Sequence, residues 1–150
     1  MLKELQIRRD NRRVKSIQEI NEFFEKLKLQ VPSQFKEFLL TYEGCGMSSG
    51  NSYYYDEADG LHEINQILYL KKGEIGASIE AIYEGHQFYG NIGFIPFAID
   101  SGGWDYNISI KEESFGQVWV DKFDLGEENP MYYVSPSFEF FINNLTEERN

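Results

Sequence analysis

The stretch over residues 91–110, NIGFIPFAIDSGGWDYNISI, constrains the fold more than any other part of the chain. Its first half, from Gly93 to Ile99, is a nearly unbroken apolar run. Such a run predicts a strand that is buried on both faces, or a short strand that ends in an apolar loop. From Trp104 to Ile110, apolar and polar residues alternate strictly. Because successive side chains of a strand point to opposite faces, this half predicts a strand with one buried face and one face in water.

The two halves are separated by the segment Asp100-Ser101-Gly102-Gly103. Its two glycines permit backbone conformations with positive φ that other residues resist. The whole stretch therefore predicts a strand, a tight turn and a second strand, with acidic groups clustered at the turn.

Three segments have the apolar spacing of helices. The first, over 16–28, begins with a capping box in which the Ser16 hydroxyl and the Glu19 carboxylate satisfy free amide groups reciprocally. The second, over 32–42, has Pro32 in its first turn, and Gly44 can end it in a left-handed conformation. The third, over 136–145, follows an N-cap at Ser135.

Further strands are predicted over 117–123 and 131–134, where Val, Trp and Tyr are frequent. Residues 64–70 and 77–85 are expected to form two short helices or loops that cover the sheet. The two new strands and the two halves of the stretch above should lie in one antiparallel sheet.

At 150 residues the chain is expected to form one domain with its own core. We expect a basic N-terminal arm over 1–15, a single domain over 16–146 and a polar tail over 147–150. No apolar run approaches the roughly 20 residues that span a bilayer, and the N-terminus lacks the apolar core of a secretory signal. A cytoplasmic protein without membrane contact is therefore expected. The single cysteine, Cys45, excludes an internal disulfide and a cysteine-built zinc site.

The charge of the chain is distributed unevenly. Residues 1–15 contain six Lys and Arg against two Asp and Glu, whereas the whole chain has a net charge of −11, so residues 16–150 carry −15. A body this acidic repels nucleic acid and anionic membranes and attracts basic surfaces. The alternative is that the charge serves solubility alone.

The sequence shows no nucleophile–base pair, metal cluster or phosphate-binding loop, so we expect no catalysis, no metal and no cofactor. An enzyme that uses Asp100 and Asp105 as general acid and base is the alternative, but this pair has no supporting residue. Acidic groups gather near the predicted turns, with Trp104 as a candidate aromatic anchor. Carboxylates that only face water, and a tryptophan in the core, are the competing interpretations. The candidate partner-binding residues are Asp56, Glu57, Asp59, Asp100, Trp104, Asp105, Asp121, Asp124, Glu127 and Glu128.

Four segments, in order, resemble the SMI1/KNR4 family of the SUKH superfamily. They are VPSQFKEFLLTYEGCG after the first predicted helix, IPFAIDSGGWDYNISI, GQVWV and the closing SPSFEFFINNL. Counted from the first predicted helix, the resemblance extends over roughly residues 16–146. Val31 stands where the family usually has Leu, and Glu43-Gly44-Cys45-Gly46 replaces the more usual Asn-Gly-Gly ending of the second helix.

The resemblance implies an α+β fold: a twisted, mainly antiparallel sheet with helices packed on one face. Bacterial members of the family resemble immunity proteins that bind and neutralise toxin domains, many of them nucleases. We therefore expect a non-enzymatic protein that binds a cognate, basic toxin domain and does not itself bind nucleic acid. Eukaryotic relatives resemble regulatory scaffolds, so a scaffold without a toxin partner is the alternative. No oligomeric state is predicted.

Overall fold

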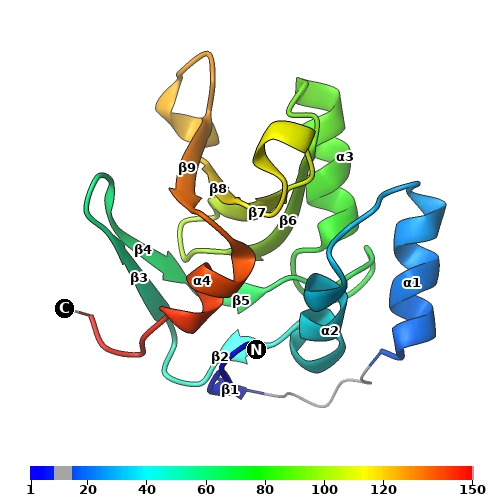
Figure 1. Cartoon of the computed structure of the whole chain (residues 1–150), viewed down its shortest axis with the longest axis horizontal. Coiled ribbons are helices and arrows are strands. Elements are labelled where there is room, and N and C mark those ends of the chain that lie inside the picture. The colour runs from blue at the N-terminus through cyan, green and yellow to red at the C-terminus, as the bar shows by residue number, and fades with distance from the viewer. Residues whose placement is uncertain (9–14, 150) are drawn as a thin grey trace.

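The computed structural model describes residues 1–8 and 15–149 (Figure 1). In chain order its elements are β1 (Ile7–Arg8), α1 (Ile17–Lys26), α2 (Ser33–Tyr42), β2 (Gly46–Met47), β3 (Ser52–Asp56), β4 (Gly60–Ile64), β5 (Gln66–Ile67), α3 (Ile79–Tyr89), β6 (Phe94–Ile99), β7 (Asp105–Ser109), η1 (Glu112–Ser114), β8 (Val118–Asp121), η2 (Phe123–Leu125), β9 (Met131–Ser135) and α4 (Phe138–Asn143). Within the described part of the chain, no helix combines the length and the apolar character that a membrane span requires.

Seven strands form one sheet in the order β1-β2-β5-β6-β7-β8-β9, and β3 and β4 form a two-stranded hairpin. The pairings between these named strands are antiparallel. The four strands predicted from the sequence are β6, β7, β8 and β9, and they lie side by side as expected. The α+β fold with a mainly antiparallel sheet is therefore confirmed.

The aromatic core lies between the sheet and the helices α1, α2 and α4. Tyr106 of β7 stacks on Phe141 of α4 with 5.8 Å between ring centroids, and Phe97 of β6 meets the same ring at 5.9 Å. Phe35 of α2 contacts Phe97 edge-on at 6.2 Å, and Phe24 of α1 lies 6.0 Å from Phe35. Rings in such edge-on and stacked contacts add to the stabilisation that their burial provides.

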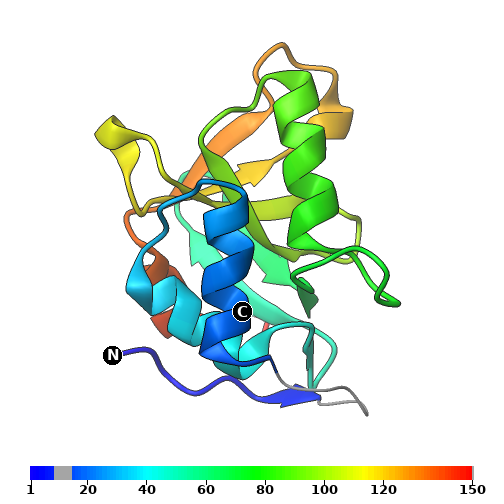
Figure 2. The ribbon, with the colours of Figure 1, turned by 90° about the vertical axis from the view of Figure 1, so that its right-hand side faces the viewer.

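Helix α3 covers part of the opposite face of the sheet, in addition to the helices expected on one face. Tyr106 points into the aromatic core, so its neighbours Asp105 and Asn107 point the other way, because side chains alternate along a strand. Both of these neighbours contact His86 of α3. Figure 2 shows α3 standing apart from α1 and α2.

The polar side of β7 is buried, so the predicted face in water is wrong. The five residues of β7 are all buried, including the polar Asp105, Asn107 and Ser109. The predicted alternation is present, but α3 lies over the polar side and its histidine bonds to the polar groups there. Alternation in a strand distinguishes two faces without revealing which of them meets water.

The first two predicted helices are present close to their expected bounds. Helix α1 follows the predicted capping box, in which the Ser16 hydroxyl accepts from the Glu19 N–H and the Glu19 carboxylate accepts from the Ser16 N–H. Gly44 follows α2 with φ of +76°, which is the left-handed conformation expected for it.

Two other predictions about helices need correction. Helix α4 is capped by Ser137, whose hydroxyl accepts from the backbone N–H of Phe140, and not by Ser135. Ser135 instead ends β9, where it pairs with Val118. Residues 64–70 contain the strand β5 and no helix, whereas 77–85 overlap α3.

The described part of the basic N-terminal arm packs on the domain. Strand β1 pairs with β2, and the buried Leu5 donates its backbone N–H to the hydroxyl of Tyr42 at 2.9 Å. The arm's basic residues Arg9, Arg12 and Arg13 lie outside the described residues.

Candidate functional site

Three connections of the chain meet at one end of the sheet and bring the predicted acidic turns together. They are the β3–β4 turn at 57–59, the β6–β7 turn at 100–104 and the β8–β9 loop at 122–130. Lys122 joins them, because its Nζ lies 2.9 Å from Oδ1 of Asp59 and over the rings of Trp104 and Tyr132, at 5.4 and 4.5 Å from their centroids. We call residues 56–59, 100–105 and 121–130 the acidic end.

The candidate carboxylates of the acidic end differ in exposure. Asp56 and Asp100 are half-buried. Oδ1 of Asp100 accepts the backbone N–H groups of Gly102 and Trp104, each at 2.9 Å, and so shapes the turn. Burial raises the pKa of Asp100, although these backbone bonds act in the opposite direction. The exposed candidates are Glu57, Asp59, Asp124, Glu127 and Glu128.

Aromatic donors hold the β8–β9 loop in place. The half-buried ring of Trp104 packs partly against the hydrophobic core, while its Nε1–H donates to Oδ1 of Asp124 at 2.6 Å. The hydroxyl of Tyr132 donates to Glu127. Trp104 therefore serves the fold and also borders the exposed carboxylates of the loop.

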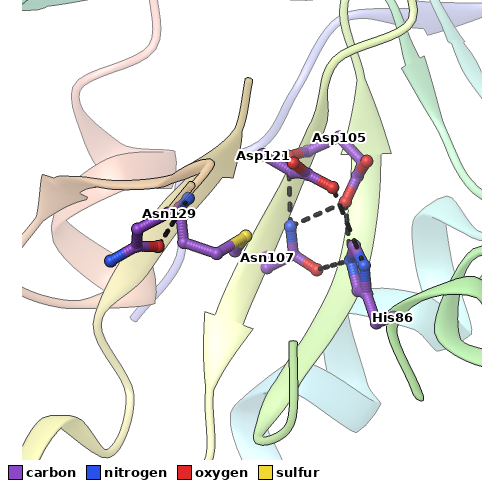
Figure 3. A network of polar contacts seen from close by, with 6 residues as sticks. His86, Asp105, Asn107, Asp121 and Asn129 are labelled. Carbon is purple, nitrogen blue, oxygen red and sulfur yellow. Dashed lines mark hydrogen bonds and ion pairs between the residues drawn. The ribbon is translucent and has the colours of Figure 1, made fainter. Parts of the chain in front are cut away.

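Asp105 and Asp121 are buried rather than exposed near a turn, and a histidine lies between them. Nε2–H of His86 donates to Oδ2 of Asp105 at 2.8 Å and to Oδ1 of Asn107 at 2.9 Å (Figure 3). Asn107 donates from Nδ2 to the same Asp105 oxygen at 2.8 Å. On the other side of the ring, Nδ1 of His86 lies 3.7 Å from Oδ2 of Asp121. We call these four residues the histidine cluster.

The surroundings of His86 favour its charged form. Burial alone would lower its pKa, but the hydrogen bond and charge of Asp105, together with the charge of Asp121, outweigh burial and raise the pKa above its ordinary value. Burial and the neighbouring charge of Asp105 raise the pKa of Asp121 to about 6, against the opposing effect of His86. Oδ1 of Asp121 is buried and has no hydrogen-bond partner among the described residues.

Three members of the histidine cluster, His86, Asp105 and Asp121, line a cleft of about 530 Å³ between α3 and the β8–β9 loop. Tyr89 of α3 and Phe123 of η2 border the cleft, with 78% and 54% of their surfaces exposed. Exposed aromatic rings with polar groups around them are typical of a surface that binds another protein. The residues that line the cleft are Ile82, Gly85, His86, Tyr89, Asn91, Asp105, Asp121, Phe123, Glu127, Glu128 and Pro130.

The histidine cluster is also the group whose geometry comes nearest to a metal site among the described residues. His86, Asp105 and Asp121 each offer one ligand atom, all within 4.8 Å of one another. Nε2 of His86 is already engaged by Asp105 and Asn107, which leaves Nδ1, beside the Asp121 carboxylate, as the ring nitrogen for a metal. The raised pKa of His86 favours a proton on that nitrogen, whereas a metal needs a neutral imidazole, so the contacts fit a hydrogen-bonded network better than a metal centre.

His62 of β4 forms a second buried polar contact near the hairpin turn. Its Nδ1 lies 2.9 Å from the hydroxyl of Tyr106, and its Nε2 lies 3.4 Å from Oδ2 of Asp59. Burial lowers the pKa of His62; Asp59 opposes this shift and Lys122 adds to it. Burial also raises the pKa of Tyr106, so its hydroxyl stays neutral and is a poor nucleophile. The contact therefore fits a structural hydrogen bond.

The sequence profile of the SMI1 / KNR4 family (SUKH-1) matches residues 16–144. The chain belongs to the SMI1/KNR4 family. A comparison with curated proteins found no match. The SUKH family is known for immunity proteins of toxin systems and is generally a non-enzymatic domain.

This SMI1/KNR4 domain places three residues at the cleft that sequence reasoning missed: His86, Tyr89 and Phe123. A signal for His86 was available. Ile79, Ile82 and His86 are spaced by three and four residues, which puts them on one face of a helix. Tyr89, three residues after His86, continues this face. No comparable pattern marks Phe123, because its exposure depends on how the β8–β9 loop folds.

Proposed function

We propose that this SMI1/KNR4 domain is an immunity protein that binds a cognate bacterial toxin domain and neutralises it by contact, without catalysis. Membership of the family supports the immunity role. The observation that carries the choice of surface is the gathering of three acidic turns at one end of the sheet, beside the exposed rings of Tyr89 and Phe123.

The charge of the acidic end supports a basic partner, and a nuclease is the partner we propose. A domain that cleaves nucleic acid needs basic side chains to bind the phosphate backbone. A protein that covers those side chains with carboxylates competes directly with the substrate. The attraction speeds the encounter of the two proteins and weakens as salt screens it.

Exposed apolar side chains near the acidic end supply anchors for the bound state. Phe88 and Leu125 are also exposed and lie next to Tyr89 and close to Phe123 in the chain. A few well-packed aromatic anchors usually dominate the affinity of an interface, whereas charges at its rim contribute less. We therefore assign the rate of association to the carboxylates and the rate of dissociation to the rings.

The test is co-expression with the toxin domain encoded beside this chain, followed by binding kinetics of the two purified proteins. The informative variant is Glu127→Gln with Glu128→Gln, in the acidic end. Its matched control is Glu112→Gln with Glu113→Gln, because η1 carries two exposed neighbouring glutamates at the other end of the sheet. The wild-type chain should restore growth, and the first variant should associate more slowly and with a flatter salt dependence than the control.

Absence of both rescue and binding would overturn the immunity role for this pair. Rescue by the wild type, with equal effects of the two double variants on association, would show that the acidic end is the wrong surface. Binding without rescue would favour the regulatory-scaffold alternative.

A further inference from the structure

Asp121 is a buried carboxylate with an unused acceptor. Its side chain is 7% exposed, and its Oδ1 has no hydrogen-bond partner among the described residues. Leaving a buried acceptor unpaired is costly, because the group has lost water without gaining a donor. Asp121 is among the residues that line the cleft, so its carboxylate lies at the wall that a donor from another molecule would meet there.

The groups around Asp121 make the cleft selective for a cation. Asp105, Glu127 and Glu128 line the same cleft, and His86 is the basic side chain among the described lining residues. The Nε2–H of His86 is already donated to Asp105 and Asn107. Carboxylates thus outnumber positive charges at the lining, and an incoming positive charge reduces their mutual repulsion.

The aromatic side chains at the rims of the cleft further restrict which kind of cation fits it. Tyr89 and Phe123 come from two different elements and expose most of their rings. An aromatic face attracts a cation held close to it, and a planar guanidinium also stacks on it. A bare metal ion would leave both rings unused.

We infer that this cleft is an anchor pocket for one arginine side chain of the partner, which bonds to Asp121 and stacks against Tyr89 or Phe123. This inference rests on the proposed function, since the arginine belongs to the toxin domain. Arginine fits better than lysine because its guanidinium offers five donors in a flat fork, which can serve Asp121 and a glutamate of the loop together.

The first test measures binding of the cognate toxin domain to single variants. Tyr89→Ala and Phe123→Ala should each weaken binding by about 30-fold, as expected for the loss of an aromatic anchor. The matched control is Phe115→Ala, because Phe115 is 53% exposed, much like Phe123, but lies beside η1 at the other end of the sheet and does not line the cleft. If Phe115→Ala weakens binding as much as Tyr89→Ala does, the pocket is not the anchor.

The second test needs no toxin. Arginine amide, lysine amide and citrulline amide are titrated into the isotope-labelled chain, and amide shifts near Asp121 and Phe123 are followed by NMR. Citrulline keeps the shape of arginine without its charge. Arginine amide should give saturable shifts, lysine amide weaker ones and citrulline amide none, and Asp121→Asn should abolish the response in a chain whose remaining spectrum shows it folded. Equal responses to arginine and citrulline, or no response to arginine, would overturn the pocket.

The two tests separate the possible failures. If the wild type rescues growth and binds the toxin domain, but Tyr89→Ala and Phe123→Ala bind it with unchanged affinity, the anchor pocket is refuted and the immunity role stands. A saturable response to arginine amide without rescue or toxin binding would refute the immunity role and leave an arginine-binding cleft.

Discussion

His86 of α3 donates from Nε2 to Oδ2 of Asp105 on β7 across 2.8 Å. This buried contact ties α3 to the sheet face that is opposite the aromatic core. Because α3 also supplies one wall of the cleft, the same contact helps to set the shape of the candidate binding site. A buried ion pair is weak evidence of stability, but removing one partner leaves the other charge uncompensated. The pKa of His86 therefore reports whether its contacts with Asp105 and Asp121 are formed.

The two histidines of the chain should titrate on opposite sides of their ordinary pKa, which is about 6.5. His86 should titrate above it because of Asp105 and Asp121, and His62 below it because of burial. NMR of the imidazole protons over a pH series measures both values in one sample. Asp105→Asn should lower the pKa of His86 and leave that of His62 unchanged. A wild-type His86 that titrates at or below the ordinary value would contradict the geometry described above.

The same shifts predict how the free energy of unfolding depends on pH. The folded pKa of His86 exceeds its unfolded value, so its contribution is complete below about pH 6.5 and is lost as the pH rises through the folded pKa. The raised pKa of Asp121 acts in the same direction at lower pH, between about 4 and about 6. The lowered pKa of His62 has the opposite effect, because its contribution is present above about pH 6.5 and is lost as the pH falls.

Urea unfolding from about pH 6.5 to about pH 8 therefore reports mainly on His86 among these three groups. The free energy of unfolding of the wild type should fall over this range. His86→Gln should show a clearly smaller fall, even though it is less stable at the lower pH. If the two proteins lose stability in parallel, His86 is not the group responsible.

The phenylalanines of helix α4 allow a test of which face of the helix is buried. Phe141 is fully buried and contacts the rings of Tyr54, Phe97 and Tyr106. Phe141→Ala should lower the free energy of unfolding by about 3–5 kcal/mol, the usual range for deleting a buried phenylalanine. The adjacent Phe140 is 48% exposed and serves as the matched control, since Phe140→Ala should cost about 1 kcal/mol. Equal losses in urea unfolding would show that the faces of α4 are assigned wrongly.

Local chemistry made much of the fold predictable. The capping box at Ser16 and the alternation along β7 depend on a few adjacent residues, and both appear as expected. Helix α3 was harder to predict because Gly85 interrupts its pattern. A glycine inside a helix costs only about 1 kcal/mol, and the burial of Ile79 and His86 on the inner face offsets such a cost.

The candidate site was less predictable because its electrostatics depend on distant pairs. A lone aspartate in a strand is expected to face water. Asp105 and Asp121 are buried because His86, on another element, supplies compensating charge and a donor. The β6–β7 and β8–β9 turns lie at one end because consecutive strands of the sheet are antiparallel. The position of the β3–β4 turn beside them could not be predicted from the sequence, because its contact joins Lys122 to Asp59, 63 residues away.

The turn after α2 offers a last test, which separates backbone strain from steric overlap. Gly44 and Gly60 both have positive φ, of +76° and +89°. A Cβ at Gly44 would overlap the ring of Tyr69, whereas a Cβ at Gly60 would meet nothing within 4 Å. Gly60→Ala should therefore lower the free energy of unfolding by about 1–2 kcal/mol, the cost of a left-handed residue with a side chain. Gly44→Ala should cost more, because Tyr69 must also move. Urea unfolding of the two variants measures the difference. Equal losses in the free energy of unfolding would mean that the chain around Tyr69 rearranges without a free-energy cost.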